Sequence, residues 1–169
     1  KNFEKLILPG VGSFKTCFKK LEEYGWKSEI LEYVDKKKYL LGICLGMQLM
    51  FEWGDEDGGS QGLNIFKGKV KKIETKNDEK LPHVGWNNIQ LERENELFRG
   101  ISNNVDYYFI HTYECLTENK SEIIATTEYG ERKNIIASIS NGKNVYGTQF
   151  HPEKSPPNGL KILKNFDSF

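Results

Sequence analysis

The stretch Tyr39-Leu-Leu-Gly-Ile-Cys-Leu-Gly-Met-Gln-Leu-Met-Phe51 is almost wholly apolar, yet it holds two glycines with a cysteine between them. Its first part, 39–43, is a continuous apolar run that is short enough for a buried parallel strand. Gly42-Ile-Cys-Leu-Gly46 then has the form G-x-C-x-G, the thiol counterpart of the nucleophile elbow. At such a turn the backbone passes close to its neighbours, and only glycine leaves room. The pattern predicts a strand over 39–43, a sharp turn at Cys44 and a helix over 45–53.

Cys44 has two interpretations at this turn. A thiol at the carboxyl end of a strand and the N-terminus of a helix would feel the positive end of the helix dipole, which favours the nucleophilic thiolate. A buried cysteine is also a common small apolar core residue. The pentapeptide alone does not decide between the two.

A cysteine nucleophile needs a base and a group that orients the base. His151 directly follows the strand-like run 145–150, and Glu153 lies two residues further on. Residues i and i+2 at a strand end share a face, so Glu153 can reach the ring nitrogen that His151 turns away from the thiol. Cys44, His151 and Glu153 are therefore a candidate triad, and a surface histidine in a proline-containing turn is the alternative.

The other two histidines compete for the role of base. His111 ends an aromatic strand, where a hydrogen-bonded structural histidine is the simpler interpretation. His83 precedes Trp86 and Asn87-Asn88, a combination that suits either an interface edge or a core turn. The residues alone leave these alternatives open.

The rest of the chain predicts an α/β architecture with a strand-rich second half. Residues 5–8 form a short apolar run that is closed by the glycine-rich turn 9–12, and Ser13 is a candidate cap for the helix that follows. Asn141-Gly142 is a two-residue turn of the kind that closes a tight hairpin. The segments 55–60 and 77–80 are the most loop-like. Further helices are expected over 14–24, 27–36 and 159–166, and further strands over 67–74, 105–110, 123–127, 135–139 and 145–150.

Composition limits the class of protein. The 169 residues suit one domain, 1–169. Lys+Arg and Asp+Glu each total 24, so the strong single-sign charge of a nucleic-acid binder or a polybasic membrane binder is missing. The three cysteines are widely spaced without a C-x-x-C pair, which argues against a disulfide framework or a zinc site and favours a cytoplasmic protein. No apolar run approaches the ~18 residues of a membrane span.

Five segments of distinctive sequence follow one another along nearly the whole chain. They are Pro9-Gly-Val-Gly-Ser-Phe14, Gly42-Ile-Cys-Leu-Gly-Met-Gln48, Pro82-His-Val-Gly-Trp-Asn87, Tyr108-Phe-Ile-His-Thr-Tyr113 and Gly147-Thr-Gln-Phe-His-Pro-Glu-Lys-Ser155. Together they resemble the class I (triad) glutamine amidotransferases and, more closely, the glutaminase subunits of imidazole glycerol phosphate synthases. The Cys elbow and the His-x-Glu segment are shared by the wider class, and the others point to this subfamily.

The resemblance assigns roles by position. It implies that Cys44 is the nucleophile, that His151 is the general acid/base and that Glu153 orients the histidine, which settles the choice among the three histidines. It also implies an oxyanion hole that uses backbone N–H groups near Val11 and at Leu45.

The remaining carried-over residues surround these groups. Gly10 and Gly12 would make a flip of the oxyanion turn sterically cheap. Gln48, one helical turn from the cysteine, matches a substrate contact on the same helix face. The other matched substrate contacts are Glu56, Thr112 and Tyr113, and the matched interface residues are Trp86 and Asn87.

The resemblance further implies a fold, a reaction and a partner. The fold would be a flavodoxin-like, mostly parallel sheet flanked by helices. Glutamine would be hydrolysed to glutamate and ammonia without cofactor or metal, and a (β/α)8-barrel cyclase subunit would receive the ammonia in a heterodimer. Family members begin with a β-α unit before the segment that starts here, so we expect an N-terminally truncated chain. Alternatives are a paralogous glutaminase that serves the amidation of a surface sugar, and a non-catalytic protein that only docks a partner.

Overall fold

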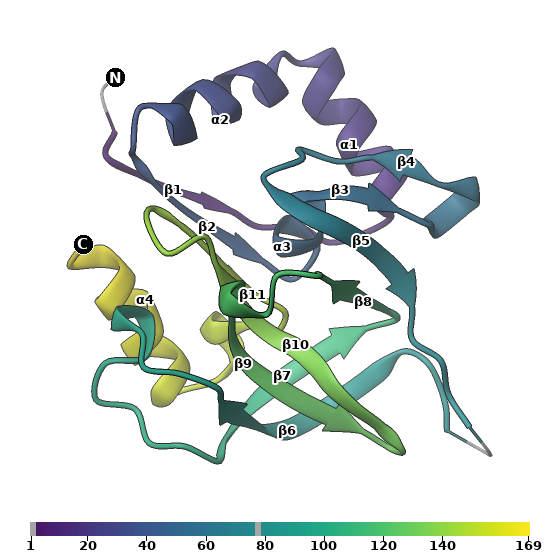
Figure 1. Ribbon diagram of the computed structural model, residues 1–169, viewed down its shortest axis with the longest axis vertical. Helices are drawn as coiled ribbons and strands as arrows, with labels where there is room; N and C mark the ends of the chain where they lie inside the picture. The colour runs from purple at the N-terminus through teal and green to yellow at the C-terminus, as the bar shows by residue number, and fades with distance from the viewer. Residues whose placement is uncertain (1–2, 77–78) are drawn as a thin grey trace.

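The computed structural model describes residues 3–76 and 79–169, and these residues build a central seven-stranded sheet and a smaller four-stranded sheet (Figure 1). In spatial order the central sheet is β1 (Lys5–Leu8), β2 (Tyr39–Ile43), β11 (Val145–Thr148), β10 (Arg132–Ser140), β9 (Ile123–Tyr129), β6 (His83–Leu91) and β7 (Val105–His111). The smaller sheet is β4 (Ser60–Gln61), β3 (Phe51–Gly54), β5 (Phe66–Lys72) and β8 (Tyr113–Leu116).

The predicted α/β class is confirmed, and the central sheet is mixed. Among the described strands of this sheet, the parallel pairs are β1 with β2 and β2 with β11, where the connections are long enough for helices. The other neighbours pair antiparallel, and short loops join β9 to β10 and β10 to β11. The sheet is thus less parallel than expected, and its parallel part carries the cysteine elbow.

Helices cover both faces of the parallel strands (Figure 1). On one face lie α1 (Phe14–Glu23) and α2 (Trp26–Asp35), and on the other lies α4 (Asn158–Asp167). Successive residues of β2 divide between the two cores, with Leu40 in the first and Leu41 in the second, as strand alternation requires. The expected cap is confirmed, since Ser13 Oγ accepts a hydrogen bond from the Thr16 N–H at 3.3 Å.

The helix after the elbow is much shorter than predicted. It is α3 (Leu45–Leu49), and the expectation of a helix to residue 53 was wrong. Phe51 is fully buried and opposes Phe66 in the parallel pairing of β3 with β5. The centroids of the two rings lie 5.6 Å apart. Tertiary pairing in the smaller sheet therefore overrides the apolar helical pattern of this segment.

The turn at Asn141-Gly142 also differs from the prediction. The hairpin loop between β10 and β11 has four residues, 141–144, instead of two. The Asn141 side-chain oxygen accepts hydrogen bonds from the N–H groups of Lys143, Asn144 and Val145, so it replaces the backbone contacts of a tighter turn. Within the segments expected to be loops, 55–60 contains the 3₁₀ turn η1 (Glu56–Gly58), and residues 77–78 of 77–80 lie outside the described residues.

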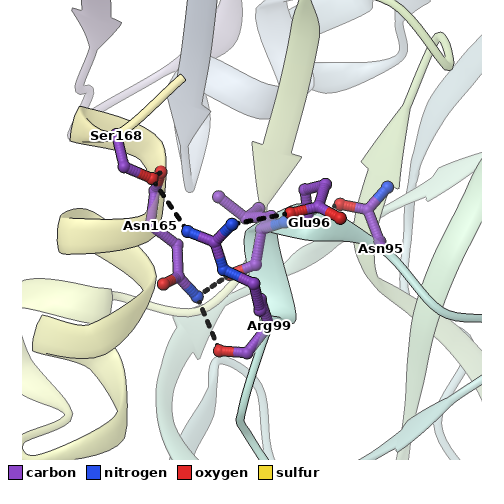
Figure 2. Close-up of polar contacts among 6 residues, drawn as sticks. Asn95, Glu96, Arg99, Asn165 and Ser168 are labelled. Carbon is purple, nitrogen blue, oxygen red and sulfur yellow. Dashed lines mark hydrogen bonds and ion pairs between the residues drawn. The ribbon is translucent and has the colours of Figure 1, made fainter.

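The C-terminal helix α4 is held by the segment around η2 (Glu96–Phe98) (Figure 2). The Asn165 amide donates to the carbonyl oxygens of Leu97 and Arg99, both at 3.0 Å. The Arg99 guanidinium in turn donates to Glu96 and to Ser168. Two further 3₁₀ turns are η3 (Lys120–Glu122) and η4 (Pro152–Lys154). Over the described ranges, no helix combines the length and the apolar character that a membrane crossing requires.

Candidate active site

The elbow has the strained geometry that its sequence predicts. Cys44 has φ +52° and ψ −111°, a conformation that L residues seldom adopt. A Cβ at Gly46 would lie 1.7 Å from the Leu8 carbonyl oxygen, and one at Gly42 would lie 2.7 Å from the Met47 nitrogen. Both glycines are therefore required by the close packing of the turn, which fixes Cys44 at the carboxyl end of β2.

A cavity of about 320 Å³ opens at this end of the parallel strands. It is lined by Gly10, Val11, Gly12, Cys44, Leu45, Gln48, Glu56, Pro82, Ile110, His111, Thr112, Tyr113, His151 and Lys154. Every residue that was predicted to form the oxyanion hole or to contact the substrate is in this set. The structure therefore brings together segments that are up to 144 positions apart in the chain, from Gly10 to Lys154.

His151 and Glu153 form the pair that the sequence suggested. The His151 ring is buried, and its Nδ1 lies 2.7 Å from Glu153 Oε1. The other ring nitrogen, Nε2, is buried with no hydrogen-bond partner among the described residues. The backbone of His151 is also fixed, because its N–H donates to the Tyr108 carbonyl at 2.9 Å and its carbonyl accepts from the Ser155 hydroxyl at 2.6 Å. An oriented imidazole thus leaves one nitrogen free at the cavity that Cys44 also lines.

The protonation of Cys44 differs from the expectation. Burial raises the pKa of its thiol to about 11, although the Leu45 N–H and the Gln149 amide oppose this rise. The expected preference for the thiolate was wrong for the chain without ligand, because α3 is a single short turn whose dipole does not outweigh desolvation. Cys44 therefore stays protonated at neutral pH and needs a base to become a nucleophile.

His83 and His111 form a separate buried pair between β6 and β7. His83 Nδ1 lies 3.1 Å from His111 Nε2, His83 Nε2 lies 2.8 Å from Asn87 Oδ1, and His111 Nδ1 lies 2.8 Å from the Tyr113 carbonyl oxygen. Burial lowers the pKa of both rings, that of His111 to about 3. His111 reaches the cavity wall, but all four ring nitrogens of the pair have close partners, so neither ring is placed as His151 is.

The glycine-rich turn that follows β1 lies against the start of α3 at the cavity. A Cβ at Gly10 would lie 3.0 Å from the Leu45 Cβ, so the two segments predicted to supply oxyanion donors are in contact. Val11 is 82% exposed, and a Cβ at Gly12 would meet nothing within 4 Å. This turn is therefore open on its outer side.

The predicted substrate contacts are held by hydrogen bonds of their own. Gln48 Nε2 donates to the Tyr113 carbonyl at 3.1 Å and to Gln149 Oε1 at 3.0 Å. Glu56 accepts from the Phe14 N–H at 2.6 Å, which links the cavity to the start of α1. Thr112 joins β7 to β8 at the cavity wall. These bonds fix the polar groups before any ligand enters.

The two residues predicted to lie at an interface point in different directions. Trp86 is 54% exposed and sits opposite Tyr108 in the β6–β7 register, beside the exposed pair Val84 and Ile110. We call these four side chains the exposed strip. The Asn87 side chain points inward, where its oxygen contacts His83 and its amide donates to the Glu128 carbonyl at 3.1 Å.

Sequence reasoning missed several residues of the site. Pro82, Ile110 and Lys154 line the cavity without having been singled out. Gln149 was also missed: its amide donates to Cys44 Sγ at 3.6 Å. The alternation that links His151 to Glu153 places Gln149 on the same face as His151, so this signal was present in the sequence.

Comparisons with known proteins agree with the geometry. The family described as "Glutamine amidotransferase class-I" matches residues 2–168. The imidazole glycerol phosphate synthase subunit HisH of Pelagibacter ubique is 45% identical over 169 residues, which cover 98% of this chain and 80% of the relative. The subunit of the same name from Pyrococcus furiosus is 43% identical over 163 residues, covering 96% of this chain and 80% of the relative.

Solved structures show the same fold at low sequence identity. A crystal structure of a glutamine amidotransferase has a TM-score of 0.70 at 19% identity and covers 97% of this chain and 79% of that one. The structure of PurLQS from Thermotoga maritima has a TM-score of 0.70 at 16% identity and covers 98% and 79%. With the family match and the HisH relatives, these likenesses lead to one conclusion: the chain belongs to the class I glutamine amidotransferases and, within them, to the HisH subunits of imidazole glycerol phosphate synthase.

Proposed function

We propose that this chain is the glutaminase subunit of an imidazole glycerol phosphate synthase, and that it hydrolyses glutamine to glutamate and ammonia through Cys44, His151 and Glu153. One observation carries the assignment. His151 is tied to Glu153 at 2.7 Å through Nδ1, while its Nε2 is unpartnered at the cavity that Cys44 lines. A nucleophile, a base and a group that orients the base are the minimum for acyl transfer through a cysteine.

The reaction begins with proton transfer. Because burial keeps the Cys44 thiol protonated, His151 Nε2 takes the proton as the sulfur attacks the side-chain carbonyl of glutamine. Glu153 stabilises the imidazolium that forms. The C–N bond then breaks, His151 returns the proton to the leaving nitrogen as ammonia departs, and a γ-glutamyl thioester remains on Cys44. Water, deprotonated by His151, hydrolyses the thioester to glutamate and restores the thiol.

The oxyanion of each tetrahedral intermediate needs donors that already point at it. The Leu45 N–H and a backbone N–H near Val11 belong to segments that meet at the cavity, so both fit this role. Gln48 supports the substrate assignment because its Nε2 donates to two protein oxygens, which leaves its own oxygen to accept from a ligand. Glu56, Thr112 and Tyr113 complete the polar wall of the cavity.

The exposed strip supports the proposal that a partner protein binds next to the site. Ile110 belongs both to the strip and to the cavity lining, so a protein seated on the strip would lie beside the place where ammonia is released. The related chains are named as subunits of imidazole glycerol phosphate synthase. A (β/α)8-barrel cyclase subunit is therefore the partner proposed for this strip, with Trp86 at its centre.

The test is a glutaminase assay of the full-length protein in complex with its cyclase subunit. We expect Cys44→Ala to abolish glutamate release while the complex still forms. Cys17→Ser is the matched control, since Cys17 is also a free thiol outside the cavity and serine keeps a donor toward the Val11 carbonyl oxygen, and it should retain activity. Glutamate release by Cys44→Ala at the wild-type rate would refute the triad.

A second part of this assay identifies the pathway that receives the ammonia. We expect the phosphoribosyl intermediate of the histidine pathway, added to the wild-type complex, to increase glutamate release. A lack of stimulation would favour the amidation of a surface sugar, for which a paralogous glutaminase would use the same site.

A further inference from the structure

Gln149 is a fully buried amide that connects the proposed substrate contact Gln48 to the proposed nucleophile. Gln48 Nε2 donates to Gln149 Oε1 at 3.0 Å, and Gln149 Nε2 donates to Cys44 Sγ at 3.6 Å. The backbone around Gln149 is equally fixed. Its N–H donates to the Ala137 carbonyl at 2.9 Å, and the Cys44 N–H donates to the Thr148 carbonyl at 2.7 Å. These two backbone hydrogen bonds fix the position from which the Gln149 side chain reaches the Cys44 sulfur.

The direction of this chain of hydrogen bonds is set by its far end. The Tyr113 carbonyl can only accept, so Gln48 must present its NH₂ group there, and the same group donates to Gln149. Gln149 must then receive this bond with its oxygen, which turns its NH₂ group toward Cys44. A flipped Gln149 would set two NH₂ groups against each other and an oxygen against the sulfur.

The Gln149 donor acts on a sulfur whose anion is disfavoured chiefly by burial, while the Leu45 N–H and the Lys154 ammonium also favour the anion. Cys44 is buried, and the half-exposed Glu153 carboxylate adds a like charge nearby. The Cys44 sulfur also lies 3.8 Å from the Ile110 carbonyl oxygen, which can accept from the thiol but repels a thiolate. A hydrogen bond to an ionised acceptor is stronger than one to its neutral form, so the Gln149 amide favours the thiolate over the thiol.

We propose that Gln149 is a positioning residue of the glutaminase reaction, whose amide N–H holds the Cys44 sulfur and stabilises the thiolate as His151 removes the proton. This inference rests on the function proposed above. Gln48 and Gln149 then work as one unit, because the contact that Gln48 makes with Gln149 decides which end of the Gln149 amide faces the sulfur.

The test follows the ionisation of Cys44 directly. The full-length protein in complex with its cyclase subunit is treated with iodoacetamide across a pH series, and mass spectrometry quantifies alkylation of the Cys44 peptide apart from those of Cys17 and Cys115. Gln149→Met keeps a side chain of similar length without the donor. Gln149→Glu keeps the shape and replaces the donor by a carboxylate as it ionises.

Both variants should shift the Cys44 alkylation profile to higher pH, and Gln149→Glu should shift it further because of its charge. We expect kcat for glutamine hydrolysis to fall about 10- to 100-fold, the range of one hydrogen bond to a charged group, with a smaller change in KM. The matched control is Asn165→Leu, which removes another buried amide that does not line the cavity (Figure 2). It should lower thermal stability and leave the profile unchanged.

The outcomes separate this proposal from the one on which it rests. An unchanged alkylation profile in a folded Gln149→Glu protein overturns the role of Gln149, even where Cys44→Ala confirms the nucleophile. A profile that shifts in Asn165→Leu as much as in the Gln149 variants overturns it as well, because loss of packing alone would then explain the effect. If Gln149→Met does not fold, the nearly isosteric Gln149→Glu still decides the question.

Discussion

Two glycine-rich turns follow neighbouring parallel strands, and they are packed in opposite ways. The elbow after β2 is tightly packed against neighbouring backbone: Gly46 lies against the backbone of Leu8, and Cys44 is held in a strained conformation. The turn after β1 is open: Val11 is mostly exposed, and Gly12 has empty space where a side chain would be. The nucleophile is thus fixed by close packing, whereas the turn proposed to supply an oxyanion donor has room on its outer side.

Glycine is required for a different reason in each turn. In the elbow glycine is needed for space, because a methyl group would overlap with neighbouring backbone. At Gly12 it is needed for conformation, since φ is +105° and no neighbour restricts the size of the residue. A substitution should therefore damage stability in the first turn and activity in the second.

Gly46→Ala should have the largest effect. Its Cβ would lie 1.7 Å from the Leu8 carbonyl oxygen, so β1 and α3 would have to separate. We expect the free energy of unfolding to fall by roughly 3 kcal/mol or more, measured by urea denaturation. Gly142→Ala is the comparison, since its Cβ would meet nothing within 4 Å and its cost measures only the strain of a φ of +73°. A Gly46→Ala protein as stable as the Gly142→Ala protein would show that the elbow is not closely packed.

Gly12→Ala should have an intermediate effect that falls mainly on catalysis. The strain of a positive φ costs about 1–3 kcal/mol, but an open turn can relax into another conformation and recover part of it. We expect a small loss of stability and a fall in kcat of about tenfold, because a relaxed turn misplaces one oxyanion donor. Steady-state glutaminase kinetics and a thermal melt measure the two effects. A loss of stability as large as that of Gly46→Ala would end the distinction between the turns.

Val11→Ala should have the smallest effect. The side chain is 82% exposed, so its removal should change stability by no more than about 0.5 kcal/mol. Activity should persist, because the proposed donor is a backbone N–H that alanine keeps. If kcat instead drops as far as in Gly12→Ala, the side chain of Val11 has a role that the backbone proposal does not explain.

The closed turn was the most predictable part of the chain. G-x-C-x-G after a buried strand specifies local backbone geometry, and His151 with Glu153 follows from alternation at a strand end. These features depend on residues close together in the sequence. The open turn and the substrate contacts were placed by resemblance, and the structure brings them to the same cavity.

The errors arose where distant segments decide the structure. The helix after Cys44 ends at Leu49 because Phe51 pairs with β5, which begins 15 residues later. The thiol is not predisposed to ionise, because burial by the surrounding segments outweighs the short helix. Gln149 escaped notice because its role depends on meeting Gln48 and Cys44, about a hundred positions away. Alternation at the strand end places Gln149 on the same face as His151, but it does not show which distant side chains Gln149 meets.

The buried pair of His83 and His111 has more close contacts than protons to fill them. Asn87 and Tyr113 each place an oxygen beside an outer ring nitrogen, and the two inner nitrogens face each other at 3.1 Å. Two neutral rings carry only two protons for these three close contacts, so one contact lacks a hydrogen. A third proton would create a buried cation, which the lowered pKa values of both rings oppose. β6, which carries Trp86, and β7, which lines the cavity, therefore meet at a buried histidine pair that has one proton fewer than it has close contacts.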